Sequence, residues 1–144
     1  MFFGLLATSF LFFSFAGSKG GEVIQIFLNG KLVMEQYVSM EKTVRTLQLG
    51  SGSANDKLDI YYSHCGRTGT DRTIAVKDEK NNVLKTWKFA NAKEKSGMTI
   101  IVKDILNLQK NKETKFNLVY TSQELPAGKT IALIDLGNKS FAKR

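Results

Sequence analysis

The feature that most constrains this fold is a series of short β-like runs, which turn residues interrupt about every 8 to 12 residues. Residues 22–28 and 31–38 flank Asn29-Gly30, a pair that supplies the two positive φ angles of a type I′ hairpin turn. Residues 72–78 and 83–89 flank a second polar turn. No segment keeps a sustained helical period, which argues against the βαβ units of mononucleotide-binding folds.

Residues 56–65 alternate between two faces, as in a strand with one buried side. One face carries Leu58, Ile60, Tyr62 and His64, and the other carries Asp59, Tyr61, Ser63 and Cys65. With the runs on either side, this pattern predicts an all-β fold. We expect an antiparallel β-sandwich, immunoglobulin-like or jelly-roll-like, with about eight or nine strands.

Three further details of the strand pattern can be predicted. In the second hairpin, Ile74 and Val76 should pair in the core with Trp87 and Phe89. Asp104 could cap one helical turn that carries Ile105 and Leu108, or the preceding strand could continue. Residues 125–128, Leu-Pro-Ala-Gly, predict a turn before a last strand over residues 130–136.

The first residues predict export. Residues 1–18 contain no charged side chain, and their apolar part ends at Ser14-Phe15-Ala16, the small-x-small pattern of a signal-peptidase site. The apolar run is shorter than the roughly 20 residues that span a bilayer. We therefore predict a signal peptide over residues 1–16 and a sandwich domain over residues 22–138. The protein would be periplasmic or extracellular, with no membrane span after cleavage. An uncleaved anchor stays open, because no basic side chain precedes the apolar run.

Charge and cysteine content narrow the choice of partners. Cys65 is the only cysteine, so no intramolecular disulfide can form. The net charge of +8 would attract nucleic acid, anionic lipid or acidic polysaccharide. The basic residues are spread along the chain without an aromatic-basic ribonucleoprotein motif, which argues against nucleic acid. An exported protein would instead meet the proteins and polysaccharides of the cell envelope.

The stretch His64–Thr73, HCGRTGTDRT, resembles the signature loop of cysteine-dependent phosphatases. The resemblance implies Cys65 as the nucleophile and Arg72 as the phosphate clamp. However, six residues separate the two instead of the family's five. The next run is also β-like, so the helix N-terminus that would hold the phosphate is missing. Gly66 and Gly69 are typical of a turn between strands, and we predict a turn without a catalytic residue.

Other reactive groups do not assemble in the sequence. His64 is the only histidine, which excludes a zinc site with several histidines, and no G-x-S-x-G nucleophile motif is present. We predict no metal and no cofactor.

Aromatic side chains are the best binding candidates. Trp87, with Lys85 and Lys88 close to it, could form a stacking and charged surface for a sugar or an acidic polymer. Core packing is the alternative for Trp87. Tyr61 joins the candidates because Tyr61 and Tyr62 face opposite ways, so one of them should point outward.

The strand and turn pattern of the mature region loosely resembles small uncharacterised exported β-sandwich proteins of bacteria. The resemblance implies the fold and brings no activity with it. We expect an exported, non-enzymatic module that binds a protein or polysaccharide partner in the cell envelope. The alternative is a hydrolase with a scattered site, in its sharpest version a phosphatase that uses Cys65 and Arg72. A subunit that pairs through an exposed strand edge is a third possibility.

Overall fold

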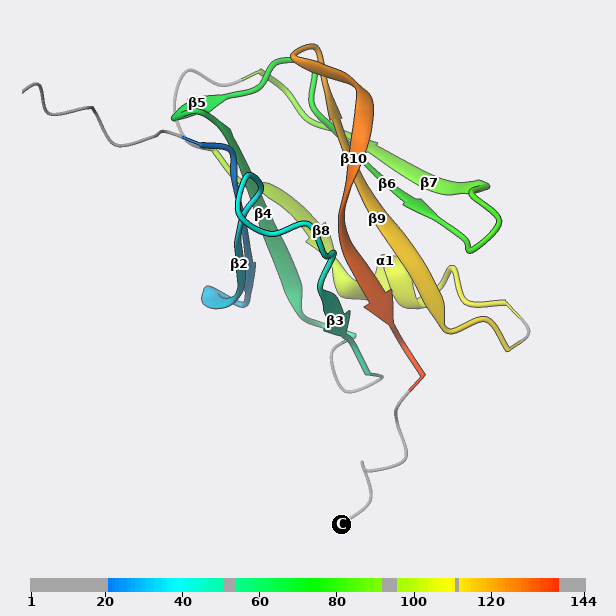
Figure 1. Ribbon diagram of the computed structural model, residues 1–144. Coiled ribbons are helices and arrows are strands. Elements are labelled where there is room, and N and C mark those ends of the chain that lie inside the picture. Colours follow the sequence, from blue (N-terminus) through cyan, green and yellow to red (C-terminus); the bar gives the residue numbers. More distant parts are fainter. Residues whose placement is uncertain (1–20, 51–53, 92–95, 111, 138–144) are drawn as a thin grey trace, which may run out of the picture.

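The computed structural model describes residues 21–50, 54–91, 96–110 and 112–137. The predicted signal peptide, residues 1–16, and residue 138 of the predicted domain lie outside the described residues. Within these ranges, ten strands form two five-stranded sheets that enclose one core (Figure 1). The predicted all-β sandwich is confirmed. Its strand number exceeds the expectation because β5 is a strand of only two residues.

The first sheet is antiparallel throughout and is built around a central strand, β4. β1 pairs with one edge of β4, and β2 pairs with the other edge of β1. β5 and β8 both pair with the other side of β4, β8 at its beginning and β5 at its end. The strands of this sheet are β1 (Val23–Leu28), β2 (Lys31–Tyr37), β4 (Lys57–His64), β5 (Arg67–Thr68) and β8 (Met98–Ile101).

The second sheet has the order β3-β10-β9-β6-β7. Its strands are β3 (Thr46–Gln48), β6 (Thr73–Lys77), β7 (Val83–Lys88), β9 (Lys115–Ser122) and β10 (Leu125–Asp135). β3 runs parallel to β10, and the other pairs are antiparallel.

Part of the strand order matches that of an immunoglobulin-like sandwich. β1, β4 and β8 take the places of strands A, B and E, which are neighbours in one sheet of that fold. β7, β6, β9 and β10 follow the order C′, C, F and G of the other sheet. These strands follow the order of the immunoglobulin-like type, one of the two predicted, while β2 and β5 are additional to it.

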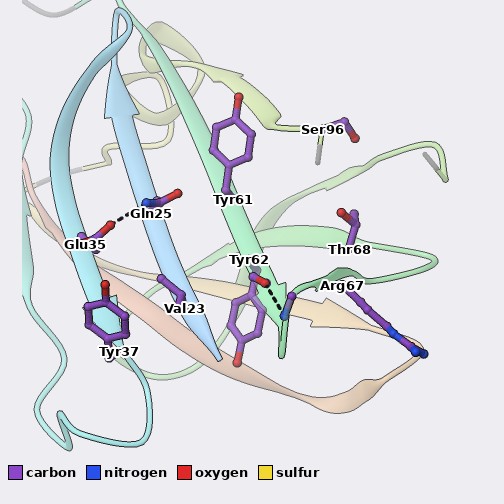
Figure 2. A pocket seen from close by; sticks show the side chains of 11 residues that line it. Val23, Gln25, Glu35, Tyr37, Tyr61, Tyr62, Arg67, Thr68 and Ser96 are labelled. Atoms are coloured by element: carbon purple, nitrogen blue, oxygen red, sulfur yellow. Dashed lines mark hydrogen bonds between the residues drawn. The ribbon is translucent and has the colours of Figure 1, made fainter. Parts of the chain in front are cut away.

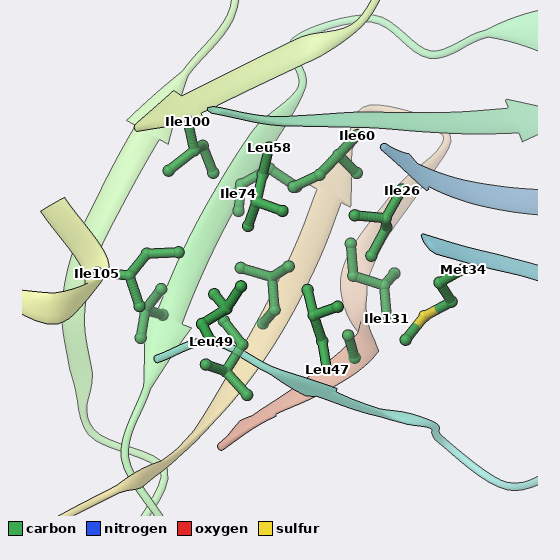
Figure 3. Packing of buried hydrophobic residues seen from close by; sticks show 14 of the residues in the cluster. Ile26, Met34, Leu47, Leu49, Leu58, Ile60, Ile74, Ile100, Ile105 and Ile131 are labelled. Atoms are coloured by element: carbon green, nitrogen blue, oxygen red, sulfur yellow. The ribbon is translucent and has the colours of Figure 1, made fainter. Parts of the chain in front are cut away.

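The core follows from the alternation within each strand. Apolar side chains of the first sheet face those of the second sheet, and Figure 3 shows them meeting between the sheets. Fully buried members include Ile24, Ile26, Leu58 and Ile60 from one sheet and Ile74, Val76, Phe116, Leu118 and Tyr120 from the other. Burying a side chain of this size contributes about 1.5–3 kcal/mol relative to leaving it exposed.

The two predicted hairpins are present. Asn29 and Gly30 have φ values of 52° and 83°, as a type I′ turn requires. In the second hairpin Ile74 pairs with Trp87 as expected. Val76 pairs with Lys85, however, because the antiparallel register that joins Ile74 to Trp87 places Phe89 opposite Arg72, whose carbonyl accepts the Phe89 backbone N–H.

Two details near the C-terminal half differ from the predictions. The ambiguous segment forms a short helix, α1 (Val102–Leu106), and Asp104 lies inside it instead of capping it. The predicted turn over residues 125–128 is wrong, since β10 already begins at Leu125. The chain reverses over residues 123–124, and the pairing of β10 with β9 shifts register between Leu125 and Lys129. A φ of +77° at Gly128 accommodates this irregularity.

Candidate functional site

A groove of about 330 Å³ crosses the outer face of the first sheet (Figure 2). Alternation produces this face, because Ile24 and Ile60 point into the core and their neighbours in sequence point outward. We call it the outer groove and define it by Val23, Gln25, Glu35, Tyr37, Tyr61 and Ser63.

The strand register arranges these side chains in two rows across the sheet. In one row Gln25 of β1 lies between Glu35 of β2 and Tyr61 of β4. In the next row Val23 lies between Tyr37 and Ser63. Neighbouring strands are about 4.8 Å apart, so the two tyrosines stand on strands separated by about 10 Å. The outer groove is therefore a small surface with an aromatic ring at each side.

The ring of Tyr61 is held in place by two neighbours. Phe27 meets it edge-on, with ring centroids 5.5 Å apart and an interplanar angle of 79°. Gly97 lies so close that a Cβ there would stand 2.9 Å from the Tyr61 Cζ atom. Tyr37 is less confined and is 46% exposed. A rigid and a freer ring thus flank the same groove.

Gln25 and Glu35 form a polar pair between the tyrosines. The Gln25 side-chain amide donates a hydrogen bond of 2.6 Å to one carboxylate oxygen of Glu35 (Figure 2). Among the described residues, the other carboxylate oxygen and the Gln25 amide oxygen have no hydrogen-bond partner. These two oxygens can accept hydrogen bonds from a ligand, and the bond between Gln25 and Glu35 fixes their orientation.

Of the residues predicted to bind a ligand, only Tyr61 lies in the outer groove. Trp87 pairs with buried Ile74 and packs against the core, on the inward face of β7. Lys85 lies on the same face, with its Nζ atom 5.2 Å from the Trp87 ring centroid and 3.8 Å from the Asp104 carboxylate. Lys88 is exposed and alternates to the opposite face. Trp87 and Lys85 therefore share one face of β7, whereas Lys88 lies on the other face and Tyr61 in the other sheet.

The groove residues that the sequence analysis missed are Gln25, Glu35 and Tyr37. Their signal was present in the first hairpin, because alternation puts Glu35 and Tyr37 on one face of their strand. What was missing was the pairing of β1 with β4, which brings this face next to Tyr61.

The stretch that resembles a phosphatase loop is a turn, as predicted. Cys65 and Gly66 connect β4 to β5 with φ values of 53° and 89°, the pattern of a type I′ turn, and Cys65 is exposed. Arg72 is buried, and its guanidinium donates to the backbone carbonyls of Ser96 and Ala90 at 2.8 and 3.1 Å. It also donates to the Ser96 hydroxyl at 3.0 Å. These three bonds hold the Arg72 guanidinium against Ser96 and Ala90.

A polar cluster joins the two sheets at one end of the sandwich. We call Glu22, His64, Tyr120 and Ser122 the His64 cluster. The Glu22 carboxylate lies 3.4 Å from His64 Nδ1, and the Ser122 hydroxyl lies 3.3 Å from His64 Nε2. The order carboxylate, imidazole, hydroxyl is the order of a catalytic triad.

The surroundings of Ser122 indicate a structural arrangement instead. The Tyr120 hydroxyl lies closer to His64 Nε2, at 2.8 Å, and the Leu125 backbone N–H donates to the Ser122 hydroxyl. Ser122 is buried, and a Cβ at Gly69 would collide with the Tyr120 hydroxyl, so the chain closes over the cluster. The cluster therefore connects β4 to β9 around a buried serine.

Tyr120 of this cluster and the neighbouring Tyr62 keep their phenolic protons. Tyr62 and Tyr120 stack with ring centroids 4.2 Å apart and nearly parallel planes. Burial raises the pKa of both phenols, and the charge of Glu22 adds to the increase for Tyr62. Since the Tyr120 phenol keeps its proton, the assignment that satisfies most groups has it donate to His64 Nε2. The ring proton then lies on Nδ1, toward Glu22.

Glu124 links the turn between β9 and β10 to the segment before β6. Its carboxylate accepts 2.8 Å bonds from the backbone N–H and the hydroxyl of Thr70. The backbone N–H is the main reason why the pKa of Glu124 falls to about 2, below the ordinary 4.5. A lowered pKa in the folded state stabilises the protein above pH 4.5, and this stabilisation disappears as the pH falls toward about 2.

We expect Glu124→Gln to lower the free energy of unfolding at pH 7, because the amide oxygen is a weaker acceptor than the carboxylate. The difference from the unchanged protein should shrink as the pH falls from 4.5 toward 2. Urea unfolding at both ends of this range measures it. Glu79→Gln, at an exposed glutamate, is the control. A difference that stays constant over this pH range would contradict the assignment.

Within the described ranges, no three histidine, cysteine or acidic side chains gather as they would around a metal ion. No helix in those ranges is long and apolar enough to span a membrane. Comparison of the chain with family models, with curated protein sequences and with solved structures finds no match.

Proposed function

We propose that this protein is an exported, non-enzymatic β-sandwich module that binds a protein or polysaccharide partner in the cell envelope. The outer groove is the observation that carries the proposal. It combines two aromatic rings with a preformed amide–carboxylate pair on a sheet face, and such a mixture of apolar and oriented polar groups is characteristic of ligand sites. The apolar leader, residues 1–16, supports export.

Two observations weigh against the alternative of a hydrolase. A phosphatase would need the Arg72 guanidinium at the phosphate, and its three hydrogen bonds direct it to Ser96 and Ala90 instead. A serine hydrolase would need substrate to reach Ser122, which is buried. The binding module therefore has the stronger support.

We expect Tyr61→Ala to weaken binding to washed cell envelopes of the producing organism about tenfold. Truncating an aromatic side chain that anchors a ligand has an effect of this size. Co-sedimentation of the purified protein with the envelopes gives the half-saturating concentration.

The matched control is Leu133→Ala, which removes a partly exposed apolar side chain from the outward face of the second sheet. It should leave envelope binding unchanged. Equal binding by the Tyr61 variant and the unchanged protein, with both folded, would contradict the proposed site. So would an equal loss in the two variants.

A further inference from the structure

We infer that the occupant of the outer groove is an uncharged, hydroxyl-rich glycan chain, an inference that rests on the proposed function. The groove offers aromatic rings and hydrogen-bonding groups in the same small surface. A pyranose ring has the matching chemistry, because its C–H face is apolar and packs on an aromatic ring while its hydroxyls point outward around its edge.

The two tyrosines provide separate platforms for sugar rings. Tyr37 stands on β2 and Tyr61 on β4, with Val23 and Gln25 of β1 between them. The strands that carry the two rings are therefore two strand spacings, about 10 Å, apart. A chain that crosses the strands would meet both rings, whereas a single small molecule would meet one.

The polar groups between the rings suit hydroxyls, which both donate and accept. Glu35 and Gln25 present a carboxylate oxygen and an amide oxygen beside their shared hydrogen bond. The side chains of Thr68 and Ser96 add hydroxyls at the edge of the groove (Figure 2). A sugar with hydroxyls on adjacent carbons can donate to the first pair and accept from the others.

The charge in the groove argues for an uncharged chain. Among the described residues that line it, Glu35 is the only acidic one and Arg67 the only basic one. Arg67 lies on β5, separated from Glu35 on β2 by β1 and β4, and Figure 2 shows its side chain extending away from the tyrosines. The overall charge of +8 is thus not concentrated here, and Glu35 would repel an acidic polymer.

A protein partner that adds a strand to β2 is less well supported. Such a partner needs the outward backbone groups of this edge strand. One of them, the Glu35 carbonyl, already accepts a 2.9 Å bond from the Arg45 guanidinium, which Glu41 holds by two further bonds. A register shift in the pairing of β1 with β2 also makes the edge irregular.

Three fractions of the same envelopes test the inference: deproteinated polysaccharide, delipidated protein, and vesicles of the extracted lipid. We expect the purified protein to bind the polysaccharide fraction, and both Tyr61→Ala and Tyr37→Ala to weaken this binding about tenfold. Raising NaCl from about 0.05 to 0.5 M should leave the affinity within about twofold, because no ion pair is involved.

The direction in which Glu35→Gln changes the binding affinity distinguishes an uncharged glycan from an acidic one. It keeps the shape of the groove and removes its negative charge. With an uncharged glycan, binding should weaken about fivefold, since an amide accepts hydroxyls less strongly than a carboxylate. With an acidic glycan, binding should strengthen.

Every other outcome contradicts the inference, the proposed function or both. Tyr61-dependent binding confined to the protein fraction would refute the glycan and leave the proposed function standing. Binding confined to the lipid vesicles would refute both. Polysaccharide binding that salt abolishes, that ignores Tyr61 or that strengthens with Glu35→Gln would refute the uncharged ligand in this groove. Failure to bind any fraction would refute the inference and the proposed function together.

Discussion

Replacing Tyr120 with alanine is expected to lower the free energy of unfolding by about 3–5 kcal/mol, the usual cost of removing a large buried aromatic side chain. Tyr120 is fully buried in β9 and stacks on Tyr62 of the opposite sheet. Its hydroxyl also bonds to His64. The side chain therefore fills the core and connects the two sheets, and urea unfolding would measure the combined effect.

Tyr120→Phe separates these two contributions. It keeps the stacked ring and removes only the 2.8 Å bond to His64 Nε2, so we expect a loss of about 1 kcal/mol. Equal losses in the alanine and phenylalanine variants would mean that the ring contributes little. That result would contradict the account of the His64 cluster as part of a packed junction between the sheets.

Replacing Arg72 with alanine is expected to lower the free energy of unfolding by about 3 kcal/mol. The change removes three hydrogen bonds that a buried charged donor makes to the backbone of Ser96 and Ala90 and to the Ser96 hydroxyl. Arg72→Lys should restore only part of the loss, because an ammonium cannot reproduce the two-pronged guanidinium geometry. Urea unfolding of the three proteins measures both effects.

Arg67→Ala is the matched control, since Arg67 is an exposed arginine on the neighbouring strand β5. Its substitution should change the free energy of unfolding by no more than about 0.5 kcal/mol. If Arg72→Ala were as mild as Arg67→Ala, the guanidinium of Arg72 would be free for another role. The phosphatase hypothesis would then regain its main missing group.

The fold was largely predictable because local rules acted without conflict. Alternation correctly divided β4 into a buried face with Leu58 and Ile60 and an outer face with Tyr61. Asn29-Gly30 correctly marked the first hairpin. The turn predicted at residues 125–128 failed because a tertiary contact, Glu124 with Thr70, favours a turn two residues earlier and a bulged strand follows it.

The outer groove was only partly predictable because it depends on strand register. Tyr61 could be found from its alternation with Tyr62. Glu35 and Tyr37 reach it only through the pairing of β1 with both β2 and β4, and the second of these pairings joins residues 30 to 40 positions apart. The position of Trp87 was not predictable either, because the local sequence does not distinguish an inward aromatic residue on an edge strand from an outward one.

An amide NMR titration of the purified protein with the deproteinated envelope polysaccharide tests the central claim most directly. The account predicts the largest shift changes at Gln25, Glu35, Tyr37 and Tyr61, the residues that cross β1, β2 and β4 on the outer face. Changes confined to the second sheet, for example around Trp87 and Lys85 on β7, would contradict the assignment of the groove as the binding site.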